Sequence, residues 1–598
     1  TGALEENTLR LTEARDAISQ LLPYVTRGDG FYQDGSFIQH TVFPYTGSYG
    51  AVTLAGIENM LYILQGTPWL IKDPNIAHVF EWVQTAFQPL FHKTAIMDMV
   101  SGRSIARKNA SDHSRGKALL ARILALAALT DDPVIQMSIR SFVKANIMED
   151  TLYFSDPRYN ETYFTAMNPN DALSFKQLLK DETVKPQQPV PLTHIYAGMD
   201  RVVFRQKGYT LGISMHSSRT GAFEIGNGEN KRAWHTADGY ISLYNDDQLQ
   251  YADNYWATVD HHRLSGTTTD HSERTNKNWA LNTSSKHWVG GVSLHGIYGV
   301  VGMDYEAEKP LSSLTAKKAW FVFDNEIVCL GAGITAADNR PVETIAENRK
   351  LRNAGDTYFS VDGTEVLPSF GSVPLHDPRW AFLGANTEDG SDSIGYYFPE
   401  SCDCVAARDL RTGTWYAIND QLSEEELMRN YLSLGIQHGD NPTDARYAYT
   451  LLPCLTEQET EAYSRTPDIQ IITNTAAVQA VREQRLGITG CVFWQKGSLA
   501  LSASRLQSLE TEQPCAVMLQ EGSGGRLSLA VCDPTQLESA VQITLTGGNY
   551  RAVPGKDVTA GAGSGDVAVH TENGRTRIVF NTAKSYGKSF LVEFEATE

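Results

Sequence analysis

The spacing of apolar residues changes near Pro191, and this change limits the possible folds more than any other feature of the sequence. Before it, apolar residues recur at helical spacing in the segments 9–25, 52–64, 76–91, 117–129 and 134–147. After it, short β-branched and aromatic segments alternate with glycine, asparagine and aspartate, which is typical of antiparallel strands. Helices that are followed by strands favour separate α and β domains over one mixed sheet.

A chain of 598 residues is too long for one ordinary core, so we expect several domains. The predicted division is an α domain at 1–180, a linker at 181–190, a central antiparallel β-sandwich domain at 191–460 and a C-terminal β domain at 461–598. The linker, DETVKPQQPV, has two prolines and no apolar stripe. The expected fold class is α+β multidomain, with antiparallel β-sandwich domains after the helices.

The net charge of −19 limits the class of partner. A nucleic-acid partner is excluded, because phosphate binding needs a basic footprint. An acidic polymer would need a locally basic cleft, which can focus an anion even in an acidic protein. No apolar run reaches the roughly 18 residues that cross a membrane. The chain begins at Thr1 without a charged and then apolar leader, so we expect a secretory signal to be absent or already removed.

All seven cysteines lie in the second half of the chain, and an odd number cannot all pair within it. Cys402 and Cys404 are too close in sequence for ordinary disulfide geometry, so we expect free, mostly buried thiols. No zinc-type spacing is present. His261 and His262 lack a third ligand at useful spacing, and a surface pair is expected there. The sequence therefore predicts no metal and no cofactor.

One loop carries most of the functional signal. The stretches 29–40 and 44–50 hold one histidine, three tyrosines, two acids and four glycines, between two helical patterns. A loop this polar and aromatic builds a poor core but is suited to gripping a sugar. A second pattern follows at Arg103 and Arg107, which lie on one face if their segment is helical. Each guanidinium offers a planar fork to a carboxylate or a sulfate.

These two motifs and the segment 215–239 resemble polysaccharide lyase family 8, which holds the bacterial hyaluronate, chondroitin AC and xanthan lyases. The matched motifs span residues 5–115 and 195–290 and follow one another in the family's order. Members of the family have an incomplete α/α toroid, then stacked antiparallel sheets, with a cleft between the two. The resemblance therefore implies that architecture for this chain.

The family cuts uronate polymers by β-elimination. A base removes the C5 proton next to the carboxylate, and the bond from C4 to the bridging oxygen breaks, leaving a 4,5-unsaturated uronate. The carboxylate charge must be neutralised by donors, and the leaving oxygen needs a proton. The family's catalytic histidine and tyrosine fall on His40 and Tyr49. Tyr49 would act as base and acid, with cations nearby to form the phenolate from a phenol whose free pKa is about 10. His40 would polarise the carboxylate or share the proton.

The resemblance also assigns roles around the arginines. The family's essential arginine falls on Arg103, and its arginine on the substrate side falls on Arg107. Glu224 and Asn227 match a glutamate and an asparagine, three residues apart, that hold the essential arginine across the cleft. Glu229 is a rival for the role of Glu224. The resemblance thus places Glu224 among the catalytic residues, and Arg107 and Asn227 among the substrate-binding residues.

We expect a secreted, extracellular bacterial enzyme whose partner is an acidic polysaccharide, hyaluronan or chondroitin. A xanthan lyase with the same chemistry is the first alternative. Xanthan lyases tend to carry an aromatic residue shortly after the position of Arg107, whereas this chain has Lys108-Asn109, which favours the glycosaminoglycans. Asn109 is also taken as a substrate-binding residue. Trp234 is a candidate for stacking on a sugar ring, with packing inside a sheet as the equal alternative.

Two further alternatives belong to other functional classes. A glycoside hydrolase needs two facing carboxylates, for which Asp29, Asp34 and Asp98 are available. A non-catalytic carbohydrate-binding fragment is the other. The family also uses an asparagine about fifty residues before its histidine, a position that falls before Thr1. The resemblance thus implies that the first helices and this asparagine are missing here, or are supplied by a separate N-terminal fragment. We expect a chain that starts at Thr1 to be nearly inactive alone, and otherwise a monomer.

Overall fold

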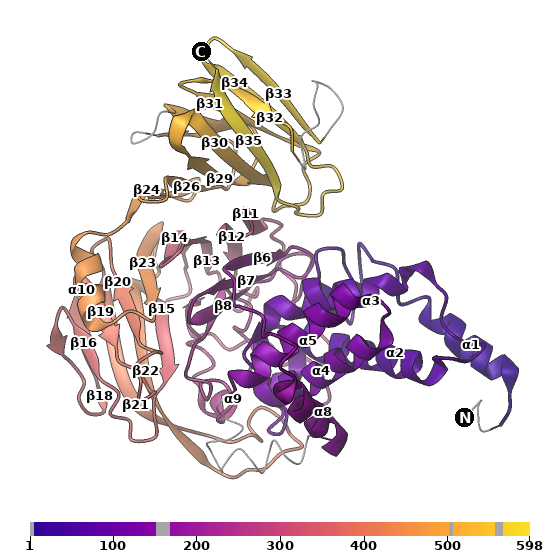
Figure 1. Cartoon of the computed structure of the whole chain (residues 1–598). Helices are drawn as coiled ribbons and strands as arrows, with labels where there is room; N and C mark the ends of the chain where they lie inside the picture. Colours follow the sequence, from indigo (N-terminus) through magenta and orange to yellow (C-terminus); the bar gives the residue numbers. More distant parts are fainter. Residues whose placement is uncertain (1–4, 151–167, 502–505, 556–565, 598) are drawn as a thin grey trace.

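The computed structural model describes residues 5–150, 168–501, 506–555 and 566–597. Figure 1 shows the helices gathered on one side, the central sheets beside them and the C-terminal sheets beyond. This arrangement confirms the predicted class, a helical region followed by antiparallel β-sandwich domains. Part of the predicted helical region, residues 151–167, lies outside the described residues.

Signals at the helix ends account for several helices. In the helical region the bounds are α1 Thr8–Ile18, α2 Ala51–Leu64, α3 Ala77–Trp82, α4 Asp112–Leu126, α5 Pro133–Met148 and α8 Pro169–Lys180. Asp132 caps α5 through its side chain, and Pro133 takes the first helical position. The predicted helix over 9–25 is wrong beyond Ile18, where the chain turns toward Pro23, a residue that disfavours helical backbone before it.

Three antiparallel sheets form the central β region. A four-stranded sheet contains β6 Leu192–Tyr196, β7 Arg201–Gln206, β8 Tyr209–Ser214 and β9 Tyr240–Tyr244. In a nine-stranded sheet the order is β11 Val289–Leu294, β12 Tyr298–Glu306, β13 Thr315–Val322, β14 Ile327–Thr335, β23 Ala445–Pro453, β20 Ile394–Tyr397, β19 Trp380–Leu383, β16 Phe359–Val361 and β17 Thr364–Glu365. A five-stranded sheet has the order β10 Thr268–Thr269, β15 Pro341–Lys350, β22 Leu427–Asp440, β21 Asp403–Gly413 and β18 Gly371–His376.

The C-terminal region is a sandwich of two antiparallel sheets. One has the order β24 Ile469–Asn474, β25 Val478–Glu483, β26 Ile488–Phe493, β29 Cys515–Glu521, β30 Arg526–Cys532, β35 Phe590–Thr597 and β32 Asn549–Val553. The other has the order β27 Gly497–Ala500, β28 Ser508–Thr511, β31 Ala540–Thr546, β34 Arg575–Asn581 and β33 Val567–Glu572. Two short helices pack against the central strands. The helix α9 Tyr255–Thr258 contacts β21 and β22, and α10 Glu457–Arg465 contacts β19 and β20.

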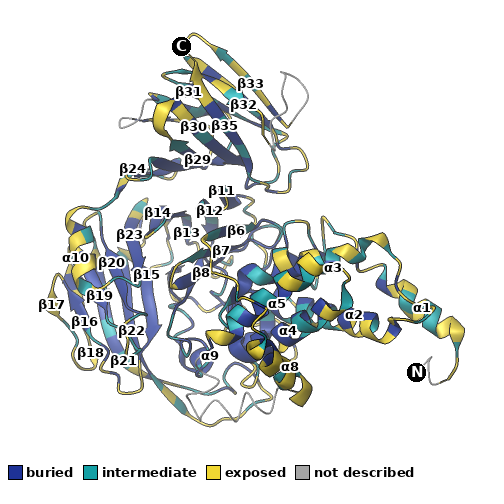
Figure 2. Cartoon of the chain, viewed as in Figure 1, coloured by how far each residue is buried: buried dark blue, intermediate teal, exposed yellow. Residues whose placement is uncertain are grey.

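The helical region shares one apolar core with central residues such as Tyr196, Tyr240 and Tyr431, whereas the central and C-terminal sandwiches enclose further cores; the inner faces of the sheets are buried in Figure 2. A further apolar cluster joins the nine-stranded central sheet to the seven-stranded C-terminal sheet, with Phe321 and Met518 among its fully buried members. This contact fixes the C-terminal sandwich against the central region. All seven cysteines are free, and five of them are buried, as predicted.

Candidate functional site

The loop with His40 and Tyr49 is a small antiparallel sheet that leads into a helix. Its strands are β1 Gly30–Phe31, β2 Phe37–Gln39 and β3 Phe43–Pro44, and the π-helix η1, Thr46–Gly50, continues into α2. His40 and Thr41 have φ of 52° and 76°, a left-handed region that such residues rarely adopt. Asp29 Oδ1 fixes this turn by accepting a 2.6 Å hydrogen bond from the Thr41 N–H. The turn and the π-helix, both frequent at functional sites, bring the His40 ring edge-on to Tyr49, with 5.0 Å between centroids.

Arg103 lies beside Tyr49 and holds its hydroxyl. The residue is 4% exposed, and its Nη2 donates to the Tyr49 hydroxyl at 3.3 Å. Two carboxylates bind the rest of the guanidinium: Nε donates to Glu224 Oε2 at 3.0 Å and Nη1 to Glu229 Oε2 at 3.2 Å. A buried charge is tolerated only when it is paired in this way. The pairing fixes the direction of the donor that reaches Tyr49.

Glu224 connects the histidine to the arginine. It is 2% exposed, and its Oε1 lies 2.7 Å from His40 Nδ1. Its Oε2 accepts from Arg103 and from the hydroxyl of Tyr45. Because a carboxylate can only accept here, the hydrogen of His40 is held on Nδ1. Nε2 is then the ring nitrogen that remains for a ligand.

Arg103 and Arg107 would share a face only if their segment were an α-helix, and this condition is not met. Gly102–Ala106 form a 3-10 helix, η6, and Arg107 is extended, with φ −111° and ψ 112°. Glu229 brings the two arginines together instead, because it accepts from Arg107 Nε and Nη2 at 2.9 and 3.1 Å as well as from Arg103. The Arg107 side chain remains 47% exposed, so one of its faces is open to a ligand.

Asn227 does not hold Arg103, in contrast to the prediction. Asn227 is exposed in a left-handed turn with φ 55°, and no hydrogen bond within the described residues links its side-chain amide to Arg103. Glu229, the rival candidate, makes that contact. Likewise, no asparagine side chain of the described residues hydrogen-bonds to His40 or Tyr49, so the family's asparagine remains a prediction.

Asn109 and Trp234, also predicted to bind substrate, lie in different environments. Asn109 is exposed, two residues after Arg107. Trp234 is 6% exposed, packs against the His262 ring at 4.9 Å and donates from Nε1 to Asn276 at 2.7 Å. The structure thus places Trp234 in a buried cluster, where its ring has no open face for a sugar.

An exposed aromatic residue at the site, Trp279, was not predicted from the sequence. The residue is 51% exposed, and its ring covers the Arg103 guanidinium at 4.8 Å and meets His40 edge-on at 6.1 Å. Only glycine fits beneath it, because a Cβ at Gly226 would lie 2.5 Å from the indole ring. Trp279 lies 55 residues after Glu224 with no local motif, so no signal in the sequence joins the two.

The site is close to charge balance and not strongly basic. Glu224 and Glu229 offset the charges of Arg103 and Arg107. Burial acts to lower the pKa of Arg103, but Tyr45 and Glu224 raise it above its ordinary value, so the guanidinium stays charged. Among the described side chains, the open face of Arg107 and Lys108, which pairs with Glu425 at 3.5 Å, offer positive charge to an anion.

The acids considered for hydrolysis are used elsewhere in the fold. Asp29 fixes the turn after His40, and Asp34 accepts from the backbone of Ser36 and Gly198. Asp98 is 5% exposed, pairs with Arg115 and accepts from the Trp256 indole at 2.6 Å. None of the three is left to face another carboxylate across the His40–Tyr49 loop.

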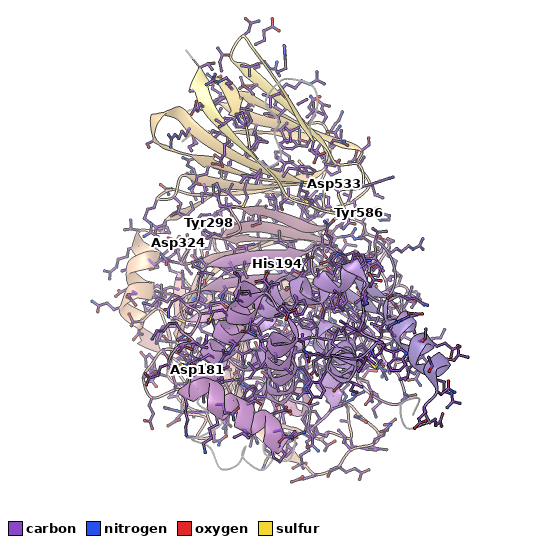
Figure 3. All side chains as sticks on the ribbon, turned by 45° about the vertical axis from the view of Figure 1, so that its right-hand side comes forward. Asp181, His194, Tyr298, Asp324, Asp533 and Tyr586 are labelled. Carbon is purple, nitrogen blue, oxygen red and sulfur yellow. The ribbon has the colours of Figure 1, made fainter. Side chains whose placement is uncertain are left out.

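One acidic group in the described chain has the composition of a cation site. Asp324, Glu326 and Glu483 place ligand oxygens within 4.8 Å of one another. Glu326 is fully buried, and neither of its oxygens has a hydrogen-bond partner. Figure 3 labels Asp324 where the central region meets the C-terminal sheets. Carboxylate oxygens suit Ca²⁺ or Mg²⁺. The expectation of no metal rested on spacing, and it missed residues that lie about 160 positions apart in the sequence.

The two histidines considered for metal are not a surface pair. His261 is 7% exposed, so that prediction is wrong for it. Burial lowers the pKa of His261 to about 3.

Replacing Glu326 with glutamine is expected to stabilise the ion-free protein at high pH. Burial, then Asp324 and Glu483, raise the pKa of Glu326 to about 8. The unfolded chain ionises near pH 4.5, so the stability contributed by the bound proton is complete below that pH and is lost as pH rises to 8. The free energy of unfolding of Glu326→Gln should therefore be close to that of the wild type at pH 4.5. At pH 8 in chelator it should exceed the wild-type value by at least about 2 kcal/mol.

Added Ca²⁺ should narrow this difference. At a hundred times its Kd, the ion should stabilise the wild type by about 2.7 kcal/mol and the variant far less. Glu457→Gln, which removes a carboxylate of α10 bonded to Ser360 and Tyr358, is the control. Equal responses of wild type and Glu326→Gln to calcium would exclude a cation at this group. Chelator is expected to leave any reaction at the His40–Tyr49 loop unchanged, because no ligand of this group belongs to that loop.

Comparisons with known proteins identify the family. Models of the N-terminal α-helical domain, the super-sandwich domain and the C-terminal β-sandwich domain of polysaccharide lyase family 8 match residues 1–145, 191–464 and 470–542. The chain belongs to polysaccharide lyase family 8. A xanthan lyase of a Bacillus species is 37% identical over 100% of this chain and 62% of its own length. A hyaluronate lyase of Thermasporomyces composti is 36% identical over 91% of this chain and 67% of its own.

Solved structures of the family share this fold. The Paenibacillus xanthan lyase superposes with a TM-score of 0.91 at 34% identity, covering 100% of this chain and 55% of that one. The Streptomyces coelicolor chondroitin AC lyase superposes with a TM-score of 0.84 at 30% identity, covering 100% of this chain and 76% of that one. The chain spans less than two thirds of the length of both xanthan lyases. Among the helices that the structure describes, none has the length and apolarity needed to cross a membrane.

Proposed function

We propose that this chain carries the catalytic centre of a lyase that cleaves uronate-containing polysaccharides by β-elimination. One observation carries the proposal: the Tyr49 hydroxyl lies 3.3 Å from Nη2 of a buried arginine and beside a histidine that a carboxylate orients. A cation at hydrogen-bond distance favours the phenolate form of a tyrosine. Tyr49 is thus suited to act as the base.

The proposed reaction uses the described residues in sequence. Tyr49 removes the C5 proton of the uronate and returns a proton to the bridging oxygen as the C4–O bond breaks. Arg103 stabilises the phenolate before the first step and after the second, and it stays in place because Glu224 and Glu229 bind its other donors. His40 donates to the uronate carboxylate through Nε2, a contact that requires the doubly protonated ring because Glu224 accepts from Nδ1. The same tyrosine serves as base and acid, so no second titrating side chain is required.

Side chains at the edge of the site are proposed to bind the sugar chain. Trp279 is half-exposed, and the CH-bearing face of a sugar packs well on an aromatic ring. Arg107 offers donors to a carboxylate or sulfate on its open face. Asn109 is exposed two residues after Arg107, and Asn227 is exposed two residues before Glu229. Of the predicted binding residues, Trp234 receives no support from its buried position.

The polymer is proposed to be hyaluronan or chondroitin, with xanthan as the alternative. Lys108-Asn109 in place of an aromatic residue supports the glycosaminoglycans. The 37% identity to a protein named xanthan lyase supports the alternative, and the 36% identity to a hyaluronate lyase supports the first. Secretion, a monomeric state and a separate N-terminal fragment remain predictions.

The test is to incubate the full-length gene product with hyaluronan, chondroitin sulfates and xanthan. Elimination forms a conjugated double bond, so ultraviolet absorbance should rise with each new chain end. New reducing ends without absorbance would indicate hydrolysis. Binding to a polymer without either product would indicate a carbohydrate-binding protein, and both results would overturn the proposal.

A further inference from the structure

Two tyrosines of the catalytic loop lie in opposite electrostatic environments. Tyr49 faces a cation, because its hydroxyl meets Arg103 Nη2 at 3.3 Å. Tyr45, four residues earlier, faces an anion, because its hydroxyl donates to Glu224 Oε2. The same hydroxyl accepts from the Arg103 backbone N–H at 3.1 Å and from its Nε at 3.3 Å. Tyr45 therefore contacts both of the charged groups that hold the site together.

The Tyr45 ring is fixed by its surroundings. The residue is 1% exposed, and the Tyr49 ring meets it edge-on at 4.9 Å. On its other side lies Gly102, where a Cβ would come within 2.1 Å of the ring and where φ is 52°. A glycine at this position lets the ring pack directly on the backbone that leads into Arg103. The hydroxyl is thus held at one place, between Glu224 and Arg103.

We propose that Tyr45 is a positioning residue, whose hydroxyl is a permanent donor to Glu224 and directs Nη2 of Arg103 to Tyr49. The inference rests on the proposed function in one respect, since it takes Tyr49 as the base. Burial and the charge of Glu224 raise the pKa of Tyr45 well above its ordinary value, so this phenol does not ionise with Tyr49. Of the two tyrosines, only Tyr49 has a cation and no carboxylate at its hydroxyl.

Loss of the Tyr45 hydroxyl should change the charges around the base. Glu224 would keep His40 and Arg103 but lose its third donor, and the Arg103 N–H would lose its acceptor. A carboxylate with fewer donors holds neighbouring protons and cations more strongly. Arg103 should then turn toward Glu224 and away from Tyr49. The charged and titratable groups that face the pair are His40, Tyr49, Arg103, Glu224 and, through Arg103, Glu229.

The test is Tyr45→Phe, which keeps the ring and removes only the hydroxyl. We expect kcat to fall about 10- to 100-fold, the scale of one hydrogen bond to a charged group, with KM within about 3-fold. The limb of the kcat/KM profile that rises with pH should move up by about one unit. A crystal structure of the variant should show a longer distance between Arg103 Nη2 and the Tyr49 hydroxyl.

Tyr396→Phe is a matched control, because Tyr396 is also fully buried and donates to a carboxylate, Glu347 Oε2, at 2.7 Å in the central sheets. It should lose comparable stability and keep the pH profile of the wild type. If Tyr45→Phe loses activity with an unmoved profile, the residue is only structural and the proposal fails. It also fails if the variant's crystal structure retains the Arg103–Tyr49 contact. The crystal structure of the variant tests this proposal even if the wild type catalyses no elimination. Absence of elimination would refute the proposed function, which is a separate result.

Discussion

Replacing Tyr49 with phenylalanine is expected to lower kcat by more than about 100-fold and to leave polymer binding nearly unchanged. The phenyl ring can keep the edge contact with His40, so the loop should fold as before. Only the hydroxyl that meets Arg103 Nη2 is lost, and with it the proposed carrier of the proton. The initial rate of absorbance increase measures the effect on kcat. Binding of a polymer fragment too short to be cleaved measures the effect on affinity.

Tyr62→Phe is the control for this change. Tyr62 lies in α2, the helix that follows the His40–Tyr49 loop, and it is 68% exposed, so loss of its hydroxyl should leave kcat unchanged. Unfolding curves of both variants should coincide with the wild type. Activity of Tyr49→Phe above about a tenth of the wild-type rate would mean that another group removes the proton.

The sequence was sufficient for the class of fold and for the order of its parts. Helical spacing before residue 180 and short β-branched runs after Pro191 depend only on neighbouring residues, so they survive in the structure. The bounds of individual strands were harder to predict where a turn lies inside an apolar run. The run 319–330 is divided into β13 and β14 at Asp324 and Asn325, a polar pair that marks the turn.

The grouping of the candidate site residues was predictable in part, for a similar reason. His40 and Tyr49 share one loop, and Glu224 was placed by a motif, so the sequence could bring these residues together. The contact of Glu229 with both arginines could not be chosen from spacing, because it depends on how the turn at Asn227 folds. Trp279 was not found at all. Its contact with Arg103 spans 176 positions, and no local pattern marks such a pair.

Arg103→Lys is expected to lower kcat by at least about 100-fold, with a smaller effect on KM. Lysine keeps the charge, but its single ammonium cannot reproduce the fork that meets Glu224, Glu229 and the Tyr49 hydroxyl together. Whichever carboxylate the ammonium approaches, the phenolate of Tyr49 loses its fixed partner. Circular dichroism and the unfolding midpoint should establish that the variant is folded before its rate is interpreted.

Arg107→Lys is the matched variant, because the same substitution is made at the neighbouring arginine on the same glutamate. The Arg107 side chain is 47% exposed and makes no contact with Tyr49 among the described residues, so its loss should act mainly through substrate. We expect KM to rise by about 5- to 10-fold and kcat to stay within about 3-fold, as for a contact equally strong in ground and transition states. If Arg107→Lys instead reduces kcat and Arg103→Lys raises only KM, the roles of the two arginines must be exchanged. Arg103 would then be the substrate contact in spite of its burial, and Tyr49 would need another cation to act as a base.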